Sequence, residues 1–147
     1  MVLTDHEISL VQTSFRKVAP GALEAAALFY ARLFELDPAL RGLFHGEMRD
    51  QEQKLMTALA LAVSSLKHPD VLRNTVRALG ERHASYGVRN EHYDTVGRAL
   101  LWTLEKRLSD DFTPEVRAAW ANLYALLATE MREGMRRVST PRDAAVA

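Results

Sequence analysis

The sequence predicts an all-α protein with about seven helices packed in one domain. Apolar residues recur every three or four positions through most of the chain, which is the spacing of helices with one buried face. Proline, glycine and capping residues interrupt this pattern at short intervals, as they do where one helix ends and another begins. No useful length of strand-like alternation is present. We therefore expect helices packed on helices with short connections.

The first three helices are marked by their start signals. Thr4 and Glu7 form a capping box that opens the first helix. Pro20-Gly21 ends that helix and opens the second, in which helical spacing predicts an inward stripe of Leu23, Ala27, Tyr30 and Phe34. Asp37 then caps a short helix, with Pro38 at its first position, that reaches to about Phe44.

Four longer helices follow a polar connection at residues 45–49. Asp50 caps the first of them, whose buried line is Gln51, Leu55, Leu59, Ala62 and Leu66. Pro69-Asp70 opens the next helix and Gly87 terminates it, Asn90 can cap the one after, and Thr113-Pro114-Glu115 opens the last. Small and polar residues from Val138 onward predict a flexible tail, so we expect a domain over 1–137 and a tail over 138–147.

Composition excludes several classes of function. The 147 residues carry 19 basic and 19 acidic side chains, which gives no general attraction to nucleic acid or to an anionic membrane. A basic cluster of Arg132, Arg136 and Arg137 is typical of a solvated helix face. The chain has no cysteine, which excludes disulfides and thiolate metal sites. Without a signal peptide or a long apolar run, the sequence predicts a soluble cytoplasmic protein.

His83 is the candidate functional residue that the pattern itself singles out. It lies in the middle of an apolar helical stripe formed with Leu72, Val76, Leu79 and Tyr86. A histidine there must either hydrogen-bond inside the core or offer a ring nitrogen to a ligand. The stripe alone leaves both interpretations open.

Four stretches of the chain carry a family resemblance. They are Phe29-Tyr30 with Leu33-Phe34, Pro38 and Leu43-Phe44; Gln51 with Lys54-Leu55; Leu79 to His83 with Tyr86 to Val88, His92-Tyr93 and Val96-Gly97; and Phe112 to Pro114 with Ala118 to Trp120 and Tyr124. In this order they resemble the single-domain bacterial haemoglobins and the globin domains of flavohaemoglobins. The last two stretches are also similar to neuroglobins. The resemblance runs from about Thr4 to Arg137 and implies a globin fold around a b-type haem.

The resemblance also implies how that haem would be held. His83 matches the proximal ligand of the iron, and neutral imidazole leaves the opposite coordination position open to a gas. Phe44 matches a phenylalanine that wedges the haem. The further residues expected to contact the haem are Leu79, Tyr93 and Leu55. Lys54, Arg82 and His45 are candidate partners of the propionates, although a solvated surface position would explain each of them as well.

Tyr30, Gln51 and Leu55 match the distal positions, where the gas binds. Dioxygen on ferrous haem carries partial negative charge, so O–H and N–H donors from Tyr30 and Gln51 would stabilise it over carbon monoxide. The alternative is that Tyr30 donates to a backbone carbonyl and Gln51 turns to solvent. We expect a protein that binds oxygen reversibly, for transport or storage, and that also binds carbon monoxide and nitric oxide. Two alternatives are a nitric oxide dioxygenase served by a separate reductase and a gas or redox sensor.

One position departs from the flavohaemoglobin pattern. That family pairs its proximal histidine with a tyrosine and a glutamate, and His83 and Tyr93 match the first two. The glutamate position holds Met135, while the side chains of Glu130 and Glu133 are expected to point elsewhere on the helix. This departure argues against a strongly electron-donating imidazole.

Overall fold

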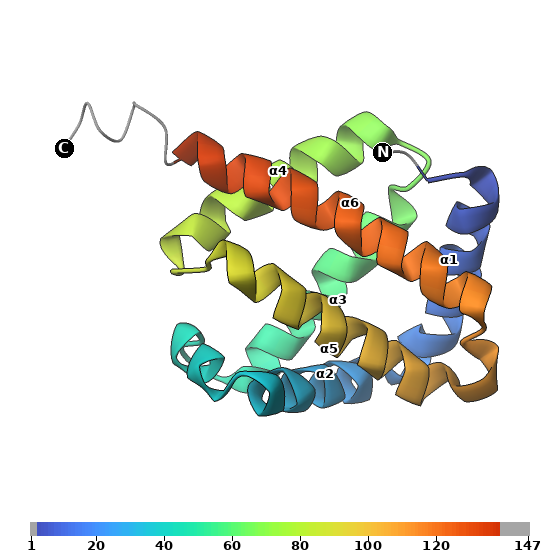
Figure 1. Cartoon of the computed structure of the whole chain (residues 1–147), viewed down its shortest axis with the longest axis horizontal. Coiled ribbons are helices and arrows are strands. Elements are labelled where there is room, and N and C mark those ends of the chain that lie inside the picture. Colours follow the sequence, from blue (N-terminus) through green and yellow to red (C-terminus); the bar gives the residue numbers. More distant parts are fainter. Residues whose placement is uncertain (1–2, 139–147) are drawn as a thin grey trace.

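The computed structural model describes residues 3–138, apart from the side chain of Ser85, and it is all-α. Its nine elements run through the chain with short connections (Figure 1). They are α1 (Asp5–Val18), η1 (Ala19–Gly21), α2 (Ala22–Leu36), η2 (Pro38–Leu43), α3 (Met48–Ser64), α4 (Pro69–Ser85), α5 (Asn90–Leu108), η3 (Ser109–Asp111) and α6 (Pro114–Val138), where η marks a 3₁₀ helix. The described residues contain no strand, so the predicted fold class is confirmed.

Several of the expected helix starts are confirmed by the capping hydrogen bonds that the structure contains. The Thr4 hydroxyl accepts the Glu7 backbone N–H at 3.1 Å, and the Glu7 carboxylate accepts the Thr4 N–H at 3.0 Å. The Asp37 carboxylate accepts the Ala39 N–H at 3.2 Å, and the Thr113 hydroxyl accepts the Val116 N–H at 3.2 Å. Each bond satisfies an N–H group that the first turn of a helix leaves without a backbone partner.

Three boundaries differ from the sequence prediction. The short helix after Asp37 is the 3₁₀ helix η2, so the described chain has six α-helices rather than seven. Helix α3 begins at Met48 and places Asp50 inside its first turn, where a carboxylate is favourable because of the helix dipole. Asn90 is the first residue of α5 and not its cap. Instead, the His92 ring accepts the Arg89 backbone N–H at 2.9 Å.

The inward stripe expected for α2 is wrong in its phase. Leu23 and Ala27 are exposed, whereas the buried residues of α2 are Ala25, Ala26, Phe29, Tyr30 and Leu33. The reason is that α2 packs against both α5 and α3, so its buried arc is wider than one stripe and is centred between the two neighbours. Tyr30 faces inward, as expected.

Helix α6 runs one residue into the segment expected to be the tail, through Val138. The rest of that segment, residues 139–147, lies outside the described residues. Within the described part of the chain, no helix is both long and apolar enough to cross a membrane.

The core has two parts. The larger contains residues of all six α-helices and includes Trp120, whose ring N–H donates to the Ser14 hydroxyl at 2.8 Å. The smaller lies where α2, η2, α3 and α5 meet, and it is rich in aromatic side chains. Leu40 of η2 and Met48 at the start of α3 both belong to this smaller core.

Helices α4 and α6 form the most extensive helix pair and cross each other in Figure 1. Their backbones touch at two glycines. A Cβ at Gly80 would collide with the Met131 carbonyl, and a Cβ at Gly134 would collide with the Arg77 carbonyl. The two contacts are reciprocal, so each helix supplies one glycine to the other, and together they fix how α4 sits on α6.

We expect Gly134→Ala to lower the free energy of unfolding by about 1–3 kcal/mol, because the added methyl group forces two backbones apart. Urea unfolding followed by circular dichroism measures this loss. The matched control is Gly42→Ala, where a Cβ meets nothing within 4 Å, and we expect a change below about 1 kcal/mol there. Equal losses in the two variants would contradict the close approach of α4 and α6.

Candidate functional site

His83 occupies the last turn of α4 and uses one of its two ring nitrogens within the helix. Its Nδ1 lies 2.7 Å from the Leu79 carbonyl, which can only accept, so Nδ1 carries the proton. This tautomer leaves Nε2 as the nitrogen with a free lone pair. The ring is half-buried and lies against the Tyr86 ring, with 5.4 Å between centroids. His83 can therefore offer a neutral, oriented imidazole to a ligand.

The surroundings of His83 favour the neutral imidazole. Burial lowers the pKa of His83, and the Arg82 guanidinium lowers it further, whereas the hydrogen bond to Leu79 works in the opposite direction. A metal ligand must be unprotonated on the coordinating nitrogen, so this direction suits coordination.

The stripe predicted around His83 holds for most of its length. Leu72 and Val76 are buried and Leu79 is half-buried, but Tyr86 is 54% exposed. Tyr86 lies one residue beyond α4, and the chain turns away at Gly87, which has a φ of +84°. Unlike His83, His92 is committed to capping α5 through its Nδ1.

Tyr30 lies on α2 in the smaller core, surrounded by aromatic rings. Its ring centroid is 5.0 Å from that of Phe29, 6.1 Å from that of Phe34 and 5.3 Å from that of Phe44. Leu55 of α3 packs against the same cluster. The structure thus brings together three of the residues expected near the gas and the haem: Tyr30, Phe44 and Leu55.

The two polar side chains expected near the gas, Tyr30 on α2 and the half-buried Gln51 on α3, have no hydrogen-bond partners among the described residues. The alternative in which Tyr30 donates to a backbone carbonyl is therefore not what the structure shows. Burial raises the pKa of Tyr30 to about 12, with a smaller contribution from Glu52, so the hydroxyl keeps its proton at neutral pH.

These residues could not hold a bare metal ion. Among the described residues, no three His, Cys, Asp or Glu side chains gather in a way that could bind one. A single imidazole serves as a metal ligand only when the other ligands come from elsewhere, as they do when a porphyrin supplies four nitrogens. The half-buried His83 and the apolar aromatic cluster are the kinds of group that contact a flat, largely apolar cofactor of this kind.

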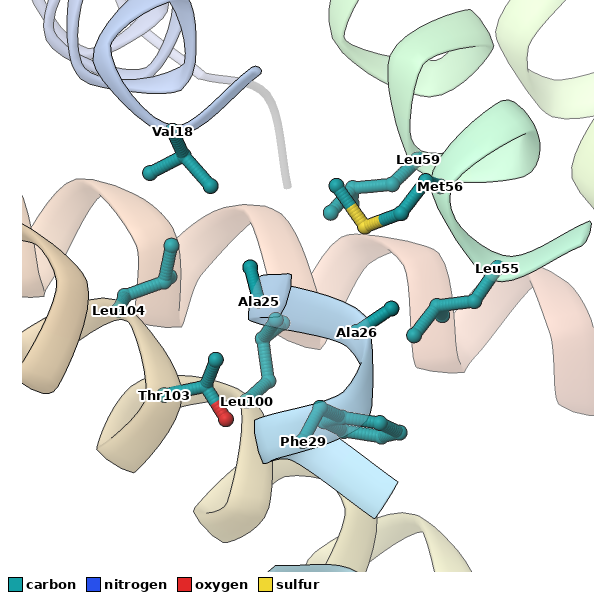
Figure 2. Close-up of a pocket in the computed structure, with 10 residues that line it drawn as sticks. All are labelled: Val18, Ala25, Ala26, Phe29, Leu55, Met56, Leu59, Leu100, Thr103 and Leu104. Atoms are coloured by element: carbon teal, nitrogen blue, oxygen red, sulfur yellow. The ribbon is translucent and has the colours of Figure 1, made fainter. Parts of the chain in front are cut away.

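A small apolar cavity lies beside the aromatic cluster (Figure 2). It shares Phe29, Leu55 and Leu100 with that cluster. The Thr103 hydroxyl on its wall donates to the Ala99 carbonyl at 2.8 Å, so the wall offers no free polar group. Cavities of this character hold small apolar molecules rather than water. The lining residues are Val18, Ala25, Ala26, Phe29, Leu55, Met56, Leu59, Leu100, Thr103 and Leu104.

Tyr93, in the first turn of α5, makes a contact that the sequence only partly anticipates. Its hydroxyl donates to the Met135 sulfur at 2.7 Å. The hydroxyl of Tyr124 donates to the Tyr93 backbone carbonyl, an interaction that the sequence analysis missed. The sequence held one hint of this packing, which is Gly97 on α5. A Cβ at that position would lie 2.7 Å from the Tyr124 ring, so the glycine makes room for Tyr124.

The candidate propionate partners remain predictions. Lys54, Arg82 and His45 are all exposed. Their positions suit both interpretations that the sequence left open.

Comparisons with known proteins agree on one family. The family model described as Globin matches residues 27–131. Neuroglobin-1 of Oncorhynchus mykiss is 30% identical over 146 residues, covering 90% of this chain and 92% of that protein. A flavohemoprotein of Rhizobium meliloti (strain 1021) is 32% identical over 130 residues, covering 86% of this chain but 32% of that protein. A hexacoordinated haem protein from an anhydrobiotic tardigrade has the same fold, with a TM-score of 0.84 at 18% identity, covering 91% of this chain and 96% of its own.

We expect the buried tyrosines to make the fold sensitive to alkali. Burial raises the pKa values of Tyr30 and Tyr93 to about 12, against about 10 in the unfolded chain. Their contribution to stability is thus complete below pH 10 and is lost as the pH rises toward 12, because the unfolded chain releases these protons first. Urea unfolding at steps between pH 9 and 12 measures the decline. The control is Tyr30→Phe, in which the decline should be shallower; an unchanged slope would contradict the burial of this hydroxyl.

Proposed function

Because this chain belongs to the globin family, we propose that it binds haem b between α3 and α4 and binds oxygen reversibly at the ferrous iron. Haem, when bound, supplies the iron at which diatomic gases coordinate. His83 would hold that iron through Nε2, and Phe44 and Leu79 would pack against the porphyrin. Leu55, on the α3 side, would limit the space open to the gas.

The observation that carries the proposal of oxygen binding is the Tyr30 hydroxyl. It is a protonated donor in an apolar aromatic cluster, and it makes no hydrogen bond within the described residues. A donor that has no partner within the protein is available to a bound ligand, and a ligand with partial negative charge would accept a stronger hydrogen bond from it than a neutral one. Oxygen is such a ligand, while carbon monoxide gains less because it stays nearly neutral.

The expected size of this effect follows from hydrogen-bond energies. A hydrogen bond to a charged group contributes about 1.5–3 kcal/mol, and about 1.4 kcal/mol corresponds to a factor of ten in affinity. A donor from Tyr30 alone would therefore slow the release of oxygen by about tenfold to a hundredfold, and a second donor from Gln51 would slow it further, to several hundredfold or more. The apolar cavity beside the cluster supports the same proposal, because it suits a small apolar gas.

The similarity to a flavohemoprotein favours one second candidate, a nitric oxide dioxygenase. The matched residues make up 32% of that protein, so we propose that a separate reductase would return the iron to its ferrous state. The pocket residues would be the same for both functions. Turnover of nitric oxide with a reductase, measured as nitrate formed per haem, separates the dioxygenase from a carrier or a sensor.

We expect His83→Ala to abolish stable haem binding, because no other described side chain offers a comparable imidazole on α4. Reconstitution with haem followed by gel filtration measures the haem that stays with the protein. Added imidazole should partly restore the Soret band. The control is His92→Ala, which removes a capping side chain and should retain haem. A normal Soret band with an iron–histidine vibration in His83→Ala would show that another residue is the ligand.

We expect Tyr30→Phe to raise the oxygen dissociation rate about tenfold or more while changing carbon monoxide release much less, because it removes one hydroxyl and keeps the ring packing. Gln51→Leu should act in the same direction more weakly, and the double variant should be non-additive because both donors address one ligand. Stopped-flow displacement of oxygen by carbon monoxide gives the rates.

The matched control for this experiment is Tyr124→Phe. It removes a buried hydroxyl whose partner is the Tyr93 carbonyl on α5, away from the aromatic cluster, so the oxygen rate should stay that of the parent. Rates within a factor of two of the parent in both Tyr30→Phe and Gln51→Leu would refute the polar pocket.

A further inference from the structure

A group of cations lies on the outer side of α2 and α5, which pack against each other (Figure 1). Its centre is the half-buried ring of Trp102 on α5. The Arg32 guanidinium of α2 lies 5.0 Å from the centroid of this ring, and the Lys106 ammonium lies 5.7 Å from it. Arg98 is exposed one helical turn before Trp102, on the same face of α5. We call Arg32, Arg98, Trp102 and Lys106 the cationic face.

The three cations of this face form no ion pair within the part of the chain that the structure describes. The nearby Arg107, in contrast, pairs with Glu24 at 3.5 Å. The Nε atom of Arg32 is buried and has no hydrogen-bond partner among the described residues. Contact with Trp102 holds two of the cations without neutralising them. The face therefore presents three unpaired positive charges, although the formal net charge of the chain is zero.

The spacing of these charges indicates a ligand with several separate negative groups. Arg98 and Lys106 are eight residues apart on α5, which is about 12 Å along a helix axis. A single small anion does not span that length, whereas carboxylates spread over a protein surface do. Tryptophan and arginine are also the residues most enriched at the centres of protein–protein interfaces. Both properties fit an acidic surface of another protein.

A nucleic acid or a second copy of this chain fits the face less well. Glu35 and Asp94 are exposed one turn from Arg32 and Arg98, and they would repel a phosphate backbone. Nucleic-acid-binding proteins carry a clear excess of basic residues, whereas this chain has 19 of each sign. Two copies paired through this face would place cations against cations, which is unfavourable.

We propose that the cationic face is a docking surface for an acidic partner protein, whose carboxylates pair with Arg32, Arg98 and Lys106 around Trp102. Helix α2 carries Arg32 on this face and Tyr30 on its buried side. A docked partner therefore lies one helix away from the aromatic cluster. The inference rests on surface residues alone and does not depend on the binding of haem.

The test measures binding of a short poly-L-glutamate peptide to the full chain by isothermal titration calorimetry. The ionic strength is about 0.1 M, where charges more than about 10 Å apart are largely screened. We expect a variant that combines Arg32→Gln, Arg98→Gln and Lys106→Gln to bind the peptide about tenfold or more weakly than the parent.

The matched control removes the same amount of charge from outside α2 and α5, and it should bind within about a factor of three of the parent because distant charges are screened. It neutralises three exposed cations, by Arg16→Gln, Arg49→Gln and Lys67→Gln.

Two further variants separate charge from packing, and circular dichroism shows whether each is folded. Trp102→Leu leaves the net charge unchanged but removes the ring that holds Arg32 and Lys106, so it should weaken peptide binding about two- to fivefold. Arg98→Gln combined with Lys106→Gln alters only exposed side chains. It should weaken binding about threefold or more without disturbing the packing of Arg32.

The proposal fails if the parent does not bind the peptide, or if the two triple variants lose equal affinity. Tighter binding of a short DNA duplex than of the peptide would assign the face to nucleic acid instead. Sedimentation velocity tests the remaining alternative. A parent that sediments as a dimer, with the Arg32, Arg98 and Lys106 variant as a monomer, would assign the face to a second copy of the chain.

Discussion

The close approach of the α4 and α6 backbones is the constraint on which the site depends. Gly80 and Gly134 let each helix rest against a carbonyl of the other, and no residue with a Cβ fits at either position without displacement. Two contacts of this kind fix both the distance and the register between the helices. His83 lies three residues beyond Gly80 on α4, so its position follows from this packing. Met135 lies one residue beyond Gly134, so the partner of Tyr93 follows from it as well.

The two sides of the site differ in how their polar groups are used. On the α4 side, the His83 ring N–H, the Tyr93 hydroxyl and the Tyr124 hydroxyl all have acceptors within the protein. On the α2 and α3 side, the Tyr30 hydroxyl and the Gln51 amide have none among the described residues. Fixed groups suit a permanent ligand, and free donors suit a ligand that comes and goes. This division is the basis of our proposal that the protein binds a gas reversibly.

The sequence predicted the helices well and some side-chain positions less well. Capping at Thr4, Asp37 and Thr113 was readable because a cap depends on residues a few positions apart. The buried face of α2 could not be predicted from the sequence, because it depends on two neighbouring helices at once. His83 could be recognised from its own stripe, whereas Tyr30, Phe44 and Gln51 could be assigned to a pocket only by resemblance. The glycine contacts and the Tyr124 hydrogen bond depend on the distance between helices, which periodicity does not contain.

The two glycine contacts tie the middle of α4 to α6, and His83 lies in the turn of α4 that follows them. The Leu79 carbonyl holds the His83 ring through its Nδ1–H group, so the ring would lose little conformational freedom on binding a ligand at Nε2.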